Sequence, residues 1–141
     1  MKDDRKIVIV PCSGIGKAYG TVSREAAYAV TLDLRPADSK LVALSLLVLG
    51  DEAARAAVAG SPAVTIDGCK LACATKMVQE SGGTVAQEVA VRDVYRRYRQ
   101  FKPQGIAKLN EGGQKLAQAM AEEIAATVDA LRESERGAAD A

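Results

Sequence analysis

In the first half of the chain, the pattern of apolar and polar positions predicts short β-branched strands that alternate with longer helical segments. Residues 6–11 form a continuous β-branched run before a Ser-Gly turn signal, which is typical of a strand buried on both faces. Glycines then open a helical segment that is predicted to end at Leu34. The leucine-rich run 41–49 fits a helix or a strand, but its length and the Gly50 that follows favour a second strand.

The second half of the chain repeats this alternation with clearer boundaries. Acid at Asp51 and alanines after it predict a helix over 51–59, which Gly-Ser-Pro ends. Apolar runs bounded by turn residues predict two more strands, at 63–66 and 84–91. Two further helices are predicted at 71–80 and 113–133, the last with Asn110 as its cap.

Strands that alternate with helices predict parallel pairing through right-handed crossovers. We therefore expect an α/β protein with a three-layer, Rossmann-like fold and a mainly parallel sheet of about four strands. A chain of 141 residues is long enough for one domain that buries close to 70% of its surface. We predict a single α/β domain over residues 1–133 and a disordered tail over 134–141.

Composition and charge exclude some classes of binding partner for this domain. The chain is 48% hydrophobic and carries a net charge of +1, so it has no global field to attract nucleic acid or an anionic membrane. Its first apolar run is shorter than a signal peptide requires, and its longest is shorter than a membrane span. We expect a soluble, cytoplasmic protein that binds a small molecule or a partner protein, with neither nucleic acid nor membrane as a partner.

Two stripes of side chains, one aromatic and one aliphatic, could be binding surfaces or parts of the core. Tyr95, Tyr98 and Phe101 alternate with arginines, as on a nucleic-acid surface, but a spacing of three residues also packs one stripe against a core. Given the neutral overall charge, we favour packing. The stripe of the last helix is likewise typical of a core, although its alanine-rich face would also suit a homodimer.

The candidate chemistry lies in the three cysteines, Cys12, Cys69 and Cys73. Cys12 follows the first predicted strand and Cys69 follows the third, so the carboxyl ends of two parallel strands bring them to one edge. Cys73 stands one helical turn after Cys69. Ligands of open α/β sheets bind at this edge. The chain has no histidine, which excludes imidazole as a metal ligand or a general base.

A metal ion suits three thiols in this position. Thiolates are favoured at a helix N-terminus and bind Zn²⁺ well, and three of them leave a fourth tetrahedral position for water, substrate or Asp67. Ser13, Gly14 and Lys17 follow Cys12 and are predicted to line the adjoining ligand pocket. The run from Cys12 to Ala18 matches no complete phosphate-binding motif.

Other interpretations of the cysteines stay open. Free cysteine is among the most buried residue types, so the three could be packing residues at strand ends. Three cysteines could also hold an iron–sulfur cluster with one open iron, although their spacing departs from common cluster motifs. A third possibility is a thiol-dependent redox or sulfur-transfer enzyme that uses Cys69 with Cys73, or Cys12 alone, without metal.

The runs PCSGIGK and VTIDGCKLACATK resemble the DGC domain family, named for the Asp-Gly-Cys that stands here at residues 67–69. The resemblance covers roughly residues 5–110. It implies a zinc site made by conserved cysteines, with no agreed biochemical activity. Family members are expected to supply four cysteines, and the fourth would fall around residues 43–45, where this chain has no thiol.

We therefore expect a zinc-binding protein with a three-cysteine site at the carboxyl edge of the sheet. A carrier of metal or sulfur is favoured over an enzyme, because the chain has no histidine and no clearly placed general base.

Overall fold

The fold is taken from a computed structural model of the chain, which describes residues 6–12, 17–68 and 72–140, without the side chains of 135–140. Four strands form one sheet in the order β2-β1-β3-β4, and every pair is parallel. The strands are β1 (Ile7–Pro11), β2 (Ser39–Leu41), β3 (Ala63–Asp67) and β4 (Val85–Ala90). The predicted α/β fold with a parallel sheet of about four strands is confirmed.

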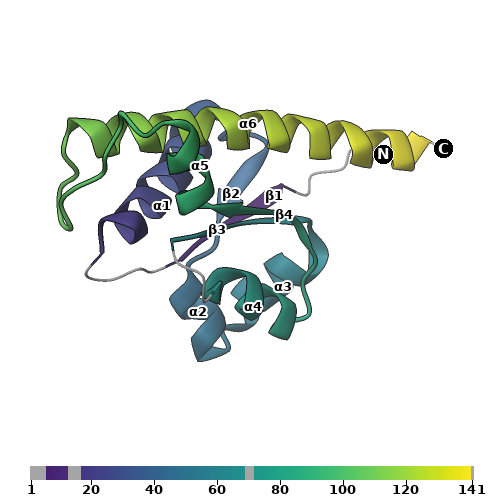
Figure 1. The fold of residues 1–141 in the computed structure, drawn as a ribbon. Helices are drawn as coiled ribbons and strands as arrows, with labels where there is room; N and C mark the ends of the chain where they lie inside the picture. Colours follow the sequence, from purple (N-terminus) through teal and green to yellow (C-terminus); the bar gives the residue numbers. More distant parts are fainter. Residues whose placement is uncertain (1–5, 13–16, 69–71, 141) are drawn as a thin grey trace.

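Helices cover both faces of this sheet, which gives three layers (Figure 1). One face carries α1 (Ala18–Tyr28), the π-helix η1 (Ala29–Leu34), α5 (Val91–Arg97) and α6 (Glu111–Asp140). The other face carries α2 (Leu44–Leu49), α3 (Glu52–Gly60) and α4 (Cys73–Glu80). Strand residues supply the two cores alternately: Ile7 and Ile9 face the first, and Val8 and Val10 face the second.

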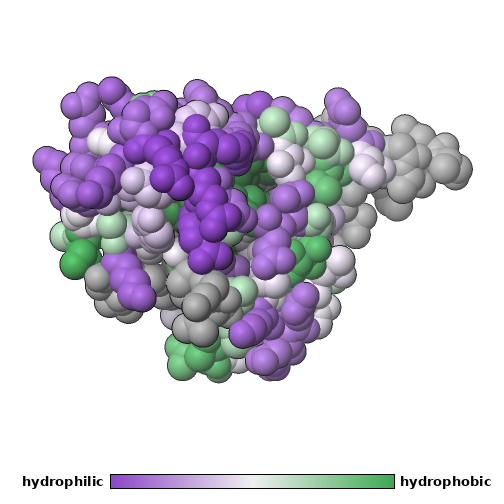
Figure 2. All heavy atoms as spheres, in the orientation of Figure 1, coloured by the Kyte–Doolittle hydropathy of each residue, from purple (hydrophilic) through white to green (hydrophobic). Residues whose placement is uncertain are grey.

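The prediction of a strand over 41–49 is wrong. Strand β2 ends at Leu41, and the leucines that follow form α2. Leu44 and Leu47 are buried, whereas Leu46, Val48 and Leu49 are exposed, which is the spacing of a helix with one face on the core. Gly50 has a φ of +78°, so it is the left-handed residue that ends a helix and not the turn after a strand. Figure 2 shows hydrophobic atoms at the lower end of the view, where α2 lies.

Helix α6 is longer than predicted. Asn110 stands at its start, where its side chain accepts a hydrogen bond of 2.8 Å from the backbone N–H of Gly113. Its apolar residues Leu116, Met120, Ile124 and Val128 are buried against the sheet. The helix then continues to Asp140, past the predicted end and through most of the segment predicted as a tail. The division of the chain into domains stays a prediction.

The aromatic stripe predicted to pack against the core does so, although helix α5 ends at Arg97 and leaves the last two aromatic residues outside it. Tyr95, Tyr98 and Phe101 are partly buried against the core that α1 and α6 form. The rings of Tyr98 and Phe101 stack with centroids 5.7 Å apart. In the part of the chain that the structure describes, no helix is both long and apolar enough to cross a membrane.

The end of η1 is tied to α6 by a two-pronged ion pair. The guanidinium of Arg35 donates to Asp129 through Nε at 2.7 Å and Nη2 at 2.8 Å. These hydrogen bonds lower the pKa of the Asp129 carboxyl and raise the pKa of Arg35, and partial desolvation opposes both shifts. The pair therefore favours the folded state only while Asp129 is ionised.

Arg35→Gln should lower stability in a pH-dependent way. Because folding lowers the pKa of Asp129, the contribution of the pair is complete above the unfolded pKa and is lost as pH falls through the folded pKa. We expect the difference in urea midpoint between wild type and variant to be largest at neutral pH and to shrink below about pH 4. The matched control Lys115→Gln, in an exposed pair with Glu111, should change the midpoint little at either pH. A difference that did not vary with pH would contradict this account.

Candidate metal centre

The site lies where the direction of chain winding changes. Helix α1 follows β1 onto one face of the sheet, and α4 follows β3 onto the other, so the segments that leave the carboxyl ends of these neighbouring strands diverge at the point where such sheets bind ligands. Cys12 follows β1 directly, and its backbone N–H donates to the carbonyl oxygen of Ile66 at 2.8 Å. Asp67 is the last residue of β3. The two predicted site segments therefore meet at one edge.

The Cys12 side chain is buried at this edge and is directed at the other segment. It is 6% exposed, and its Sγ accepts a hydrogen bond of 3.1 Å from the backbone N–H of Gly68. The hydroxyl of Ser23 lies 3.5 Å from the same sulfur and 3.1 Å from the carbonyl oxygen of Cys12. Backbone N–H groups directed at sulfur stabilise negative charge on it, as they do around metal-bound thiolates.

Gly68 lies so close to its neighbours that only glycine fits without a shift. A Cβ atom at this position would lie 3.2 Å from the Sγ of Cys12, from the backbone nitrogen of Gly20 and from the backbone carbon of Tyr19. The middle residue of Asp-Gly-Cys is thus the point where the turn after β3 packs on the thiol and on the first turn of α1.

Asp67 is 4% exposed and fastens the start of α4. One carboxylate oxygen accepts from the backbone N–H of Ala74 at 2.9 Å, and the other accepts from the hydroxyl of Thr75 at 2.9 Å. Because the Thr75 hydroxyl has a single proton, Thr65 is the donor in the 2.7 Å contact between the two threonines. These contacts suit an orienting residue, and ligation of a metal by Asp67 stays a prediction.

Helix α4 begins with Cys73, directly after a strained residue. Ala72 has φ 53° and ψ 48°, a left-handed conformation that costs a residue with a Cβ atom about 1–2 kcal/mol. Cys73 is exposed, and its thiol is free. Backbone strain of this kind concentrates at functional sites, where the surrounding contacts hold it in place. Here the bonds from α4 to Asp67 supply that restraint.

The predicted cluster is only partly within the described residues. Ser13, Gly14 and Cys69 lie outside them, while Lys17 is exposed and directly precedes α1. In the described ranges, no three His, Cys, Asp or Glu side chains gather closely enough to hold a metal ion. A cluster that includes Cys69 therefore stays a prediction.

A pocket of about 300 Å³ opens beside Cys12. It is mainly apolar, and Arg24 is the charged residue in its wall. Its lining consists of Pro11, Cys12, Arg24, Tyr28, Leu41, Ala43, Leu44 and Ser45. The segment where the family resemblance places a fourth cysteine thus lies against Cys12. Arg24 and Tyr28 were missed from the sequence, although their spacing of four residues on the helix after Cys12 places them on one face.

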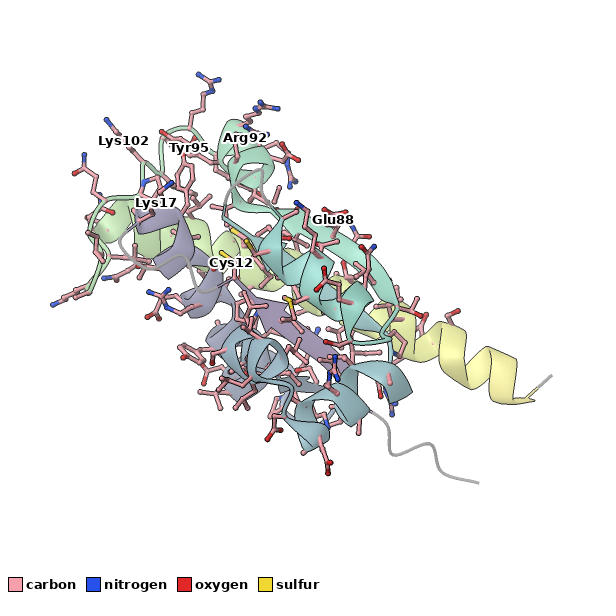
Figure 3. The ribbon with its side chains drawn as sticks, turned by 90° about the horizontal axis from the view of Figure 1, so that it is seen from below. Cys12, Lys17, Glu88, Arg92, Tyr95 and Lys102 are labelled. Atoms are coloured by element: carbon pink, nitrogen blue, oxygen red, sulfur yellow. The ribbon has the colours of Figure 1, made fainter. Side chains whose placement is uncertain are left out.

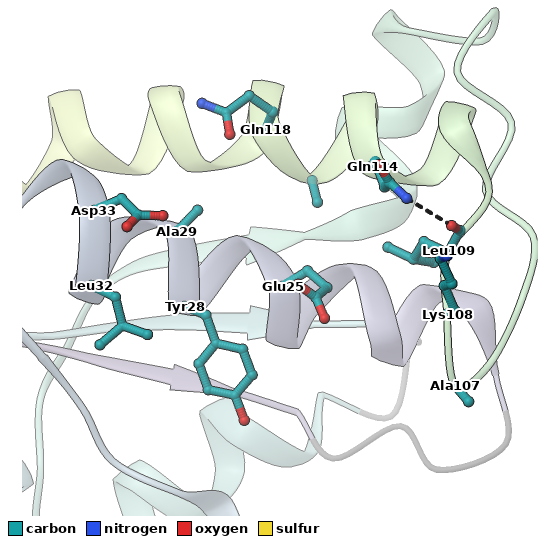
Figure 4. A pocket seen from close by; sticks show the side chains of 11 residues that line it. Glu25, Tyr28, Ala29, Leu32, Asp33, Ala107, Lys108, Leu109, Gln114 and Gln118 are labelled. Carbon is teal, nitrogen blue, oxygen red and sulfur yellow. Dashed lines mark hydrogen bonds between the residues drawn. The ribbon is translucent and has the colours of Figure 1, made fainter.

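A larger groove of about 440 Å³ lies elsewhere, between α1, η1 and the start of α6 (Figure 4). Glu25, Asp33 and Lys108 are its charged residues, and none of the described cysteines lines it. It shares Tyr28 with the pocket beside Cys12, but it lacks the thiol chemistry of the carboxyl edge.

Fold and site together define a doubly wound α/β protein with a buried thiol at the carboxyl edge, where its strand order reverses. The sequence pattern of the DGC domain family matches residues 8–128, which include both predicted site segments, so the chain belongs to this family. No curated protein and no solved structure matches the chain.

Removal of the Thr75 hydroxyl tests how firmly Asp67 is held. Thr75→Val leaves a buried carboxylate oxygen and the Thr65 hydroxyl without this partner, which should lower the free energy of unfolding by about 1–3 kcal/mol. Thr84→Val, at an exposed position, is the matched control and should stay within about 0.5 kcal/mol of wild type. Urea denaturation measures both. Equal stabilities of the two variants would show that the Asp67 contacts do not hold the start of α4.

Proposed function

We propose that this protein binds one zinc ion through Cys12, Cys69 and Cys73 and acts as a carrier of metal or sulfur. The observation that carries the proposal is the 3.1 Å contact between the Gly68 N–H and the Sγ of Cys12. Cys69 is the next residue along the chain after Gly68, whose backbone N–H contacts the first thiol. Two thiols of the predicted set thus belong to neighbouring segments.

The third thiol is supported by the start of α4. Cys73 is its first residue, and the fastening of Ala74 and Thr75 to Asp67 fixes that turn relative to β3. Three residues separate Cys73 from Cys69, a spacing that is common between the zinc ligands of one loop. The strained Ala72 lies within this span.

The donor set favours zinc over harder cations. The chain has three thiols and no histidine, and thiolates select zinc or iron–sulfur clusters over magnesium or calcium. With three protein ligands, zinc keeps one open position for water or for a transferred group. A carrier uses such a position to release its cargo, and it needs no general base.

Thiol chemistry without metal is the second candidate, and the exposure of Cys73 favours it. A free, exposed thiol at the start of a helix is accessible to a partner's sulfur, as redox and sulfur-transfer proteins require. The buried Cys12 would then be a second thiol at the same edge of the sheet. Metal content separates the two candidates.

Elemental analysis of protein purified without oxygen or chelator is the direct test. Wild type should contain about one zinc per chain, and Cys69→Ser should lose it because two thiolates hold zinc weakly. Thr84→Val, before the amino end of β4 and thus at the opposite end of the sheet, should keep the metal. Absence of any metal, together with three freely titrating thiols, would reject the zinc proposal and favour thiol chemistry. Iron with labile sulfide would instead identify a cluster.

A designed fourth thiol tests the geometry of the centre. Ser45 lines the pocket that contains Cys12, so Ser45→Cys should add a ligand and slow the loss of zinc to a chelator at least about tenfold. Ser134→Cys adds a thiol on the exposed surface of α6 and is the matched control, with no change expected. If both variants released zinc at the wild-type rate, the metal would not lie beside this pocket.

A further inference from the structure

Three cations surround the carboxyl edge on the side of α1 and α5. Lys17 directly precedes α1, Arg92 is in the first turn of α5, and Lys102 lies in the segment before α6, all exposed. Figure 3 shows these residues gathered on one side of the molecule together with Tyr95. In Figure 2 the most hydrophilic atoms lie over the same region, around α5.

None of these three cations has an anionic partner in the part of the chain that the structure describes. The ion pairs there use Arg35, Arg96, Arg97, Lys115 and Arg132. Glu88, four residues before Arg92, makes no ion pair with it. A chain with a net charge of only +1 therefore concentrates three unpaired positive charges beside one edge.

Packing between α1 and α5 holds two of these cations beside the turn after β3. The rings of Tyr19 and Tyr95 meet edge to face with centroids 6.1 Å apart. Lys17 stands two residues before Tyr19, and Arg92 stands one helical turn before Tyr95. The backbone of Tyr19 also contacts Gly68, so this arrangement is continuous with the candidate metal centre.

The strand register places Arg92 at the same edge. Asp67 at the end of β3 is paired with Ala90 at the end of β4, and Arg92 follows two residues later. Its position is therefore one strand away from the Asp-Gly-Cys turn. Arg92 emerges where ligands of parallel sheets bind.

The segment that carries Lys102 is fastened to the same region. Asn110 donates to the carbonyl oxygen of Lys102 at 3.0 Å, and the hydroxyl of Thr21 in α1 donates to the carbonyl oxygen of Ile106 at 2.6 Å. These bonds hold the segment against the first turns of α1. The backbone of Lys102 is therefore held in place on the same side of the molecule as the other two cations.

We propose that this edge binds a small molecule that carries a doubly charged oxyanion, with Lys17, Arg92 and Lys102 as the cationic contacts. This inference rests on the proposed function, because it names the class of molecule that would bind beside the thiol centre at the same edge of the sheet. Arginine binds planar and tetrahedral oxyanions through two parallel N–H groups, and lysine adds point charges around them. Phosphate monoesters and dicarboxylates share this chemistry.

Titration with inorganic phosphate, pyrophosphate and malonate tests the proposal and separates the two sources of the oxyanion. We expect saturable binding in NMR or calorimetric titrations, weakened at least about tenfold by Arg92→Gln and by Lys17→Gln. Arg55→Gln, on the exposed surface of α3 at the other face of the sheet, is the matched control and should change affinity less than about twofold. Tighter binding of phosphate or pyrophosphate would indicate a phosphate monoester as the ligand, and tighter binding of malonate would indicate a dicarboxylate.

Absence of saturable binding by wild type up to about 10 mM of every probe, or equal weakening by Arg55→Gln, would overturn the proposal. Zinc content measured on the same Arg92→Gln sample separates this failure from failure of the metal site, because Arg92 is not a ligand. Zinc near one per chain without anion binding rejects only the anion site. Anion binding by a protein that holds no metal rejects only the zinc centre.

Discussion

The parallel pairing of β1 with β3 is the constraint on which the rest of this structure depends. Four residue pairs, from Val8 with Ala63 to Pro11 with Ile66, run side by side through the middle of the sheet. Because both strands point the same way, the segments that leave them emerge together, although they are far apart along the chain. The alternation of strand side chains also creates two cores, and each core then recruits its own helices. The thiol, the glycine and the carboxylate of the site inherit their proximity from this pairing.

Much of this arrangement could be predicted because buried parallel strands carry a strong local signal. The β-branched residues 6–11 and 63–66 identify β1 and β3, and the rule for parallel strands then places Cys12 near the turn after Asp67. The run 41–49 was mispredicted because a short apolar segment has no periodicity that excludes a helix, and Gly50 ends either element. The left-handed Ala72 and the bonds of Thr75 to Asp67 depend on contacts between elements, which no local pattern encodes.

The carboxyl edge divides its charges between a dry interior and a wet rim. The carboxylate of Asp67 is buried, and its oxygens are hydrogen-bonded to the start of α4. The cations beside it remain in water, where their charge is available to a ligand. Between these layers, Cys12 is shielded from solvent by the turn that contacts its sulfur. Such layering keeps the Cys12 thiol out of water while the cations stay on the surrounding surface.

The close approach of Gly68 to Cys12 has an evolutionary consequence. A Cβ atom at position 68 would press on the Cys12 sulfur and equally on the backbone of Tyr19 and Gly20, so the glycine is restrained by both neighbours although Cys12 is 56 residues away in sequence. A descendant that lost the thiol to a smaller residue would relieve only the contact with sulfur, and the backbone of α1 would still disfavour a larger residue at position 68. Loss of the glycine first would instead displace the sulfur, and with it the first turn of α1. The order of these two replacements is therefore not symmetrical, and lineages that abandon the chemistry of this edge should lose the cysteine before the glycine.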